Sequence, residues 1–123
     1  MRFMVMAILE GDGSAASKAA PVAEGAAKLA EYGTSLRRAG VLLARDGLLP
    51  PSTRARISRV DGKVTVDDGP SVPSGGALAG YWILEVRSRE EAIEWAKRAP
   101  VSSGEVIEVR QIREMTDDPE LIR

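Results

Sequence analysis

Two short segments of this sequence, 3–9 and 81–86, carry apolar side chains at nearly every position. Successive side chains of an extended strand point to opposite faces, so each segment would bury both of its faces. The first segment is far too short to cross a membrane as a helix, and acidic and Gly residues follow it. The pattern therefore predicts two central strands of one sheet, covered on both sides.

A helix is predicted between these two strands. From Pro21 to about Ala39, apolar or small residues recur at intervals of three and four, and Gly40 suits the position after a helix end. The stripe that would face the sheet consists of Val22, Ala26, Leu29, Gly33 and Leu36. Gly33 either lets this helix approach the sheet closely or is simply tolerated there, and the sequence leaves both interpretations open.

A second helix follows the second apolar strand. It begins with Ser88-Arg89-Glu90-Glu91, a capping box in which the Ser hydroxyl and the last carboxylate satisfy free amides of the first turn. We expect it to run to about Arg98 and to stop at Pro100. The residues that it would bury in part are Ala92, Ile93, Trp95, Ala96 and Ala99.

The remaining segments predict shorter strands. Residues 41–49 indicate a strand, a turn at 45–47 and an extended segment, and 105–112 indicate a more polar edge strand. Residues 55–60 and 63–66 flank Asp61-Gly62, which favours a hairpin with a two-residue type I′ turn. This hairpin is basic, and its charge either protects its edges or binds an anion.

The order of elements is typical of an α+β fold, a ferredoxin-like βαββαβ plan with an inserted β-hairpin. Residues 1–112 would form a single domain, and the tail 113–123 would be either a short docked helix or disordered. Two helices cover only one face of such a sheet. We therefore expect a homodimer through the helix-free sheet face, which would bury the other apolar face.

Composition excludes several kinds of chemistry. The chain has no Cys and no His, which removes thiolate metal sites, a Cys nucleophile and the commonest general base near neutral pH. Its formal net charge of -1 gives no pull toward nucleic acid or a membrane surface. We expect a cytoplasmic protein with no metal, no cofactor, no nucleic-acid partner and no membrane partner.

Several segments together carry a resemblance to a known family. They are the strand RFMVMAIL, the segment AGVL to GLLPPST, the turn Asp68-Gly69-Pro70, the sequence Gly80-Tyr81-Trp82, the helix EEAIEWAKRAP and the strand EVIEVRQI. In this set the chain resembles the YCII-related family, specifically its DGPF-domain branch. The resemblance implies a dimeric ferredoxin-like α+β barrel with a pocket between the helix-free sheet face and the loops.

The chain departs from that family at two places. Ser71 stands where the name-giving motif has Phe, and the charged segment that usually follows is replaced by Val72-Pro73-Ser74-Gly75-Gly76. The His-Asp pair proposed as catalytic in other YCII-like proteins cannot be transferred, because this chain has no His. An enzymatic function would therefore rest on the fold alone, which is weak support.

Candidate site residues lie mainly at predicted strand ends. Asp68 either forms an Asx-type turn before Pro70 or acts as a general base, with Tyr81 as a donor. The ligand-binding candidates are Glu10, Arg45, Asp68, Ser71 and Tyr81. Glu85, in the most apolar strand, would either pair with an Arg such as Arg110 at a dimer rim or line a pocket with a raised pKa.

These observations leave two functions open. The first is a small homodimeric protein with a small-molecule pocket and, if it is an enzyme, a lyase- or isomerase-like proton transfer that uses Asp68. The second is a non-catalytic regulatory or protein-interaction module, which the resemblance to DGPF proteins associates with alternative sigma factors. A cavity with converging polar groups would favour the first function, and a filled dimer core the second.

Overall fold

The structure is a computed structural model in which residues 1–9, 22–49, 53–68, 76–101 and 104–114 are described, with only the backbone for 22–26. The elements, in chain order, are β1 (Arg2–Leu9), α1 (Val22–Arg38), β2 (Leu42–Gly47), β3 (Arg56–Val60), β4 (Lys63–Asp67), β5 (Ala77–Glu85), α2 (Arg89–Ala96) and β6 (Glu105–Gln111). The expected helix or disorder in 115–123 lies outside the described residues.

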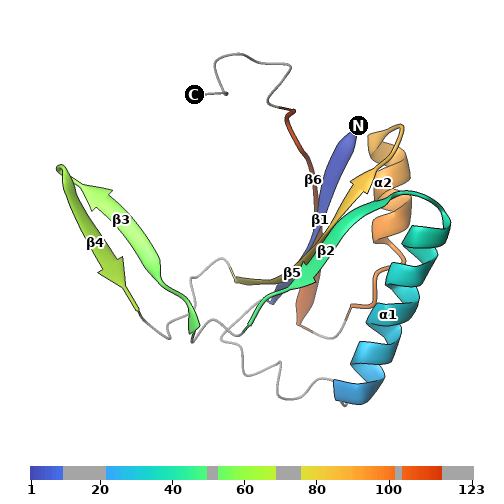
Figure 1. Ribbon diagram of the computed structural model, residues 1–123, viewed down its shortest axis with the longest axis horizontal. Helices are drawn as coiled ribbons and strands as arrows, with labels where there is room; N and C mark the ends of the chain where they lie inside the picture. Colours follow the sequence, from blue (N-terminus) through green and yellow to red (C-terminus); the bar gives the residue numbers. More distant parts are fainter. Residues whose placement is uncertain (10–21, 50–52, 69–75, 102–103, 115–123) are drawn as a thin grey trace.

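Four strands form one antiparallel sheet in the order β2-β5-β1-β6, and both helices pack on the same side of it (Figure 1). The two strands predicted to be central, β1 and β5, are the central ones, and β6 is an edge strand as expected. The fold is mixed α+β and is compatible with the ferredoxin-like arrangement.

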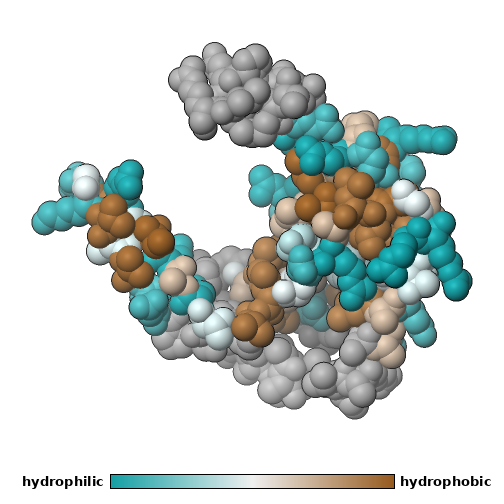
Figure 2. Space-filling view, in the orientation of Figure 1, coloured by the Kyte–Doolittle hydropathy of each residue, from teal (hydrophilic) through white to brown (hydrophobic). Residues whose placement is uncertain are grey.

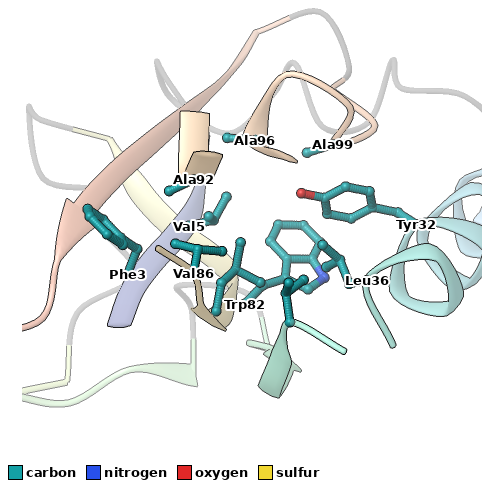
Figure 3. Packing of buried hydrophobic residues seen from close by; sticks show 11 residues of the cluster. Phe3, Val5, Tyr32, Leu36, Trp82, Val86, Ala92, Ala96 and Ala99 are labelled. Carbon is teal, nitrogen blue, oxygen red and sulfur yellow. The ribbon is translucent and has the colours of Figure 1, made fainter. Parts of the chain in front are cut away.

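The core lies between the sheet and the two helices. Its side chains alternate along β1 and β5, with Phe3 and Val5 opposite Leu84 and Trp82 in the register of the two strands. The buried cluster consists of Phe3, Val5, Tyr32, Leu36, Val41, Trp82, Leu84, Val86, Ala92, Ala96 and Ala99, most of which are labelled in Figure 3.

Helix α1 agrees with its prediction in extent and differs in its buried stripe. It ends before Gly40, whose φ of 74° is the left-handed conformation expected there. Leu29 was expected to be buried and is 40% exposed. Tyr32, which the spacing did not select, is buried instead and packs edge to face against the ring of Trp82, with 5.1 Å between the ring centroids. Figure 3 shows the two side chains next to each other.

Helix α2 begins at the predicted cap. The Ser88 hydroxyl accepts a hydrogen bond from the Glu91 amide at 3.1 Å, and the Glu91 carboxylate accepts one from the Arg87 amide at 3.3 Å. The second bond thus goes to the residue before the cap rather than to the cap itself. The helix ends at Ala96, before the expected Arg98, with Lys97 as its C-cap.

Strand β2 contradicts the turn predicted at 45–47. The strand continues through these residues to Gly47 because Arg45 and Asp46 pair with Trp82 and Tyr81 of β5. Strand β5 itself begins earlier than expected, at Ala77.

Strands β3 and β4 pair only with each other, as a two-stranded sheet. Asp61 and Gly62, with φ values of 52° and 79°, connect them, which confirms the predicted two-residue turn with positive φ at both positions. The hairpin projects away from the four-stranded sheet (Figure 1), and all residues of both strands are exposed.

The helix-free face of the four-stranded sheet carries Met4, Met6 and Ile8 of β1 and Ile83 of β5, all half-buried. No described helix is long and apolar enough to cross a membrane.

Within one chain, Glu85 contacts neither Arg110 nor the cavity, and its expected pairing at a dimer rim stays a prediction. Its carboxylate is exposed and lies 3.6 Å from the N-terminal ammonium of Met1, while Arg110 pairs with Glu108 at 4.0 Å. Glu85 is also not among the residues that line the cavity described next.

Candidate functional site

A cavity of about 270 Å³ lies beside α1 at one end of the four-stranded sheet. Its volume is close to the lower end of the roughly 300–1,000 Å³ that is typical of small-molecule pockets. Residues from both faces of the four-stranded sheet contribute to its wall. The lining residues are Ala7, Lys28, Leu29, Arg45, Asp46, Gly47, Ala79, Gly80, Tyr81, Trp82, Pro100, Val101 and Glu105.

The cavity extends to the helix-covered side of the sheet. Lys28 and Leu29 come from α1, and Trp82 belongs to the core between sheet and helices. Asp46 and Tyr81, whose side chains lie on the helix-free face, also line the cavity. The pocket implied by the family resemblance, between the helix-free face and the loops, stays a prediction.

Arg45 is positioned by both β2 and α1. Its pairing with Trp82 places it on the helix-covered side, and its Nη1 donates a hydrogen bond to the Leu29 carbonyl at 3.4 Å. A Cβ at Gly33, which is buried, would collide with the Arg45 guanidinium. The missing side chain of Gly33 thus makes room for Arg45, which supports the close-approach interpretation of this glycine.

Tyr81 and Asp46 form the second polar group at the cavity. The Tyr81 hydroxyl donates a hydrogen bond to Oδ2 of Asp46 at 3.0 Å, across the β2–β5 pairing. This hydrogen bond and the negative charge of Asp46 raise the pKa of Tyr81, so its hydroxyl keeps the proton at neutral pH. Because neighbouring side chains alternate, Tyr81 extends to the face opposite the buried Trp82.

The structure brings together only part of the site predicted from sequence. Arg45 and Tyr81 both line the cavity. Asp68 follows the end of β4, is exposed and does not line the cavity, so its role stays a prediction. Glu10 and Ser71 lie outside the described residues.

Three charged lining residues were not predicted: Lys28, Asp46 and Glu105. Asp46 was missed because Arg45-Asp46-Gly47 has the composition of a turn, and only its pairing with β5 places the carboxylate beside Tyr81. An acidic residue at the first position of a predicted edge strand, or a Lys beside the helical stripe, carries no local signal of function.

The cavity combines apolar walls with charged side chains of both signs. Leu29, Trp82 and Val101 provide apolar surface, and Arg45 provides a planar guanidinium with five N–H donors. Within the described ranges, no three His, Cys, Asp or Glu side chains are grouped so that they could hold a metal ion. The arrangement can hold a small molecule that is apolar at one end and accepts hydrogen bonds at the other.

Comparisons with known proteins place the chain in a family. None of the curated proteins compared with it matches. The model of the YCII-related domain matches residues 1–116, nearly the whole length of 123 residues. The chain therefore belongs to the YCII-related domain family.

Proposed function

We propose that this chain binds a small organic acid in the cavity beside α1, with the carboxylate held by Arg45. The observation that carries this proposal is the placement of the Arg45 guanidinium at the cavity wall, across Gly33. The apolar part of the acid would lie against Leu29 and Trp82, which line the same cavity.

The partners of the polar groups support an anionic ligand. The hydrogen bond from Arg45 to the Leu29 carbonyl uses one of five N–H donors, and at 3.4 Å it is a long bond. The neighbouring carboxylate of Asp46 accepts from Tyr81. A ligand carboxylate can therefore form a bidentate pair with Arg45 without displacing the Tyr81–Asp46 hydrogen bond.

The proposal also includes a reaction, which is a lyase- or isomerase-like proton transfer on the bound acid. The Tyr81–Asp46 pair fits this role because it joins a protonated hydroxyl to a carboxylate at the cavity. Incubation of the protein with phenylacetate, which carries protons on the carbon next to its carboxylate, in deuterated water, followed by proton NMR, tests this step. Faster exchange of carbon-bound protons that is lost in the Tyr81→Phe variant supports catalysis, and exchange at the buffer rate contradicts it.

The proposal includes a homodimer of the dimeric α+β barrel type, formed through the helix-free sheet face, and membership of the DGPF branch. The half-buried apolar side chains on that face, including Met4, Met6 and Ile83, support the dimer. The sequence Asp68-Gly69-Pro70 supports the branch. Analytical ultracentrifugation tests the dimer, and a stable monomer at micromolar concentration would contradict it.

Binding is tested with benzoate, phenylacetate and hexanoate, each compared with its neutral amide. We expect at least one acid to raise the melting temperature and to give measurable heat in calorimetry, while its amide does neither. Arg45→Gln should abolish this response, because the amide side chain cannot form the charged bidentate pair.

Two further variants locate the bound acid. Leu29→Trp should block binding by filling the cavity from an exposed position, whereas Arg110→Gln, an Arg outside the cavity wall, should not change it. If no acid exceeds its amide, or if Arg110→Gln weakens binding as much as Arg45→Gln, the proposed function is wrong.

A further inference from the structure

Two charged residues of the four-stranded sheet lie on its helix-covered face, and both line the cavity. Figure 2 shows hydrophilic side chains spread over the outside of this part of the molecule, where charges are ordinary. On the helix-covered face, only Arg45 and Glu105 are charged among the residues of the four strands. Arg45 pairs with the buried Trp82, and Glu105 pairs with Leu9, which shares a face of β1 with Val5. Opposite charges therefore meet the same cavity from the two edge strands.

Glu105 is half-buried at the start of β6. The next two residues on the same face of this strand, Ile107 and Val109, pack against the core. A carboxylate beside such neighbours costs free energy unless a partner compensates its charge. Because a carboxylate has two oxygens that accept several hydrogen bonds, Glu105 can bind a ligand cation in addition to its interaction within the chain. Its position therefore favours a positively charged group inside the cavity.

Small residues lie between the two charges. Gly47 of β2, Gly80 of β5 and Ala7 of β1 pair in one row across the helix-covered face, and all three line the cavity. Larger side chains in this row would fill the space that is now open. The cavity thus has a floor of small residues, with Arg45 on one side of the row and Glu105 on the other.

The sheet sets the distance between the two charges. β2 and β6 are its edge strands, so three strand spacings, or roughly 14 Å, separate their backbones. Arg45 and Glu105 also lie at different levels along the strands, on opposite sides of the row of small residues. Both side chains are long, but a ligand that contacts both must still carry its two charged groups at opposite ends. A molecule with both charges on neighbouring carbon atoms is too short.

The other charges of the wall agree with a ligand of this kind. Lys28, on α1, adds a second cation, and Asp46, on the helix-free face, adds a second carboxylate. Among the lining residues that the structure describes, two cations and two carboxylates therefore cancel. Such a wall favours a ligand that carries both signs over a ligand with net negative charge.

We propose that the acid bound in this cavity is an ω-amino acid, which has its ammonium at the end of the chain opposite the carboxylate. The carboxylate binds Arg45, the ammonium binds Glu105, and the hydrocarbon chain lies over the row of small residues. The inference rests on the proposed function and names the class of acid.

Pairs of isomers test the position of the ammonium. 6-Aminohexanoate and 2-aminohexanoate have the same atoms and no net charge at neutral pH, but only the first has its charges at opposite ends. In isothermal titration calorimetry, 6-aminohexanoate should bind about tenfold more tightly than 2-aminohexanoate, because only the first contacts both Arg45 and Glu105. The comparison of 8-aminooctanoate with 2-aminooctanoate covers a longer span, and hexanoate measures the contribution of the carboxylate and the chain.

Substitutions at Glu105 test its contact with the ammonium. Glu105→Gln should remove the preference for the ω-isomers, while hexanoate still binds. Glu108→Gln is the matched control and should change neither affinity, because Glu108 belongs to the same strand but lies opposite Met6 on the helix-free face, outside the cavity wall. Glu105→Lys should reverse the preference, so that hexanedioate binds more tightly than 6-aminohexanoate. A loss of stability alone would not produce such a reversal.

The results distinguish this inference from the proposed function. If neither hexanoate nor any of the amino acids binds more tightly than the corresponding amide, both are wrong. If hexanoate binds through Arg45 but neither ω-amino acid exceeds its isomer, the inference is wrong and the proposed function stands. A preference for the ω-isomers that persists in Glu105→Gln would also overturn the inference, because another group would then bind the ammonium.

Discussion

Arg45 of β2 lies directly across Gly33 of α1, in the space that a Cβ of residue 33 would occupy. The same guanidinium reaches the Leu29 carbonyl one turn earlier in the helix and lines the cavity. Because Gly33 has no side chain, the Arg45 guanidinium can lie against this part of α1. Arg45 therefore connects the helix to the cavity wall.

The effect of Gly33→Ala on stability should depend on whether the Arg45 side chain is present. Alanine stabilises a helix by about 1 kcal/mol relative to glycine, but here its Cβ must push the guanidinium aside. In urea denaturation, we expect Gly33→Ala to stabilise the Arg45→Ala variant by up to about 1 kcal/mol and the wild type by less. Equal gains in both backgrounds would show that the two residues do not interact.

Asp46→Asn should lower the pKa of Tyr81 toward its ordinary value of 10.0, because the substitution weakens the hydrogen bond that holds the Tyr81 proton and removes the negative charge beside the hydroxyl. The chain has two tyrosines, so in a Tyr32→Phe background only Tyr81 titrates. The alkaline rise of ultraviolet tyrosinate absorbance measures the shift. Asp67→Asn, at the end of β4, is the control and should leave the titration curve in place.

Tyr32 should make stability depend on pH in the alkaline range. Burial raises its pKa from 10.0 to about 12, although the charge of Arg98 acts in the opposite direction. Since the folded state favours the protonated hydroxyl, this stabilisation is complete below pH 10 and is lost as the pH rises from 10 to about 12.

Denaturation of wild type and Tyr32→Phe at several pH values tests this dependence. The variant should be less stable near neutral pH, because the Trp95 carbonyl loses the hydrogen bond that the Tyr32 hydroxyl donates at 2.8 Å. The difference in free energy of unfolding between the two proteins should shrink above pH 10. A difference that is constant with pH would contradict the assignment.

Ser88→Ala should destabilise the protein by about 1 kcal/mol, because the Glu91 amide loses the oxygen that caps α2. Ser88→Asp should retain most of the stability, since its carboxylate can accept the same bond. Ser35→Ala in the last turns of α1 serves as the control. That change should be nearly neutral, because alanine favours the helix and the Ser35 hydroxyl only donates to the Glu31 carbonyl of its own helix. Equal losses of stability for Ser88→Ala and Ser35→Ala would contradict the capping role of Ser88.

The parts of the fold that follow from short-range patterns were predictable. The central strands β1 and β5 are apolar on both faces, the Asp61-Gly62 turn requires positive φ, and Ser88 is a strong cap residue. Each of these features is decided by residues that lie within a few positions of one another.

The cavity was less predictable because its walls come from distant segments. Arg45-Asp46-Gly47 has turn composition, and only pairing with β5 extends the strand through it. Tyr32 is buried because it meets Trp82 and donates to the Trp95 carbonyl, two contacts that no helical spacing encodes. Leu29 is exposed because the cavity lies where a core contact was expected.

The position of β1 between β5 and β6 has a consequence for synthesis of the chain. The ribosome synthesises β1 well before the two strands that pair with it, β5 and β6. During that interval, the nascent chain exposes an unpaired apolar strand whose contacts are all long-range, which slows folding and favours aggregation. We therefore expect the yield of folded protein to respond to translation rate and to chaperones that bind extended apolar segments.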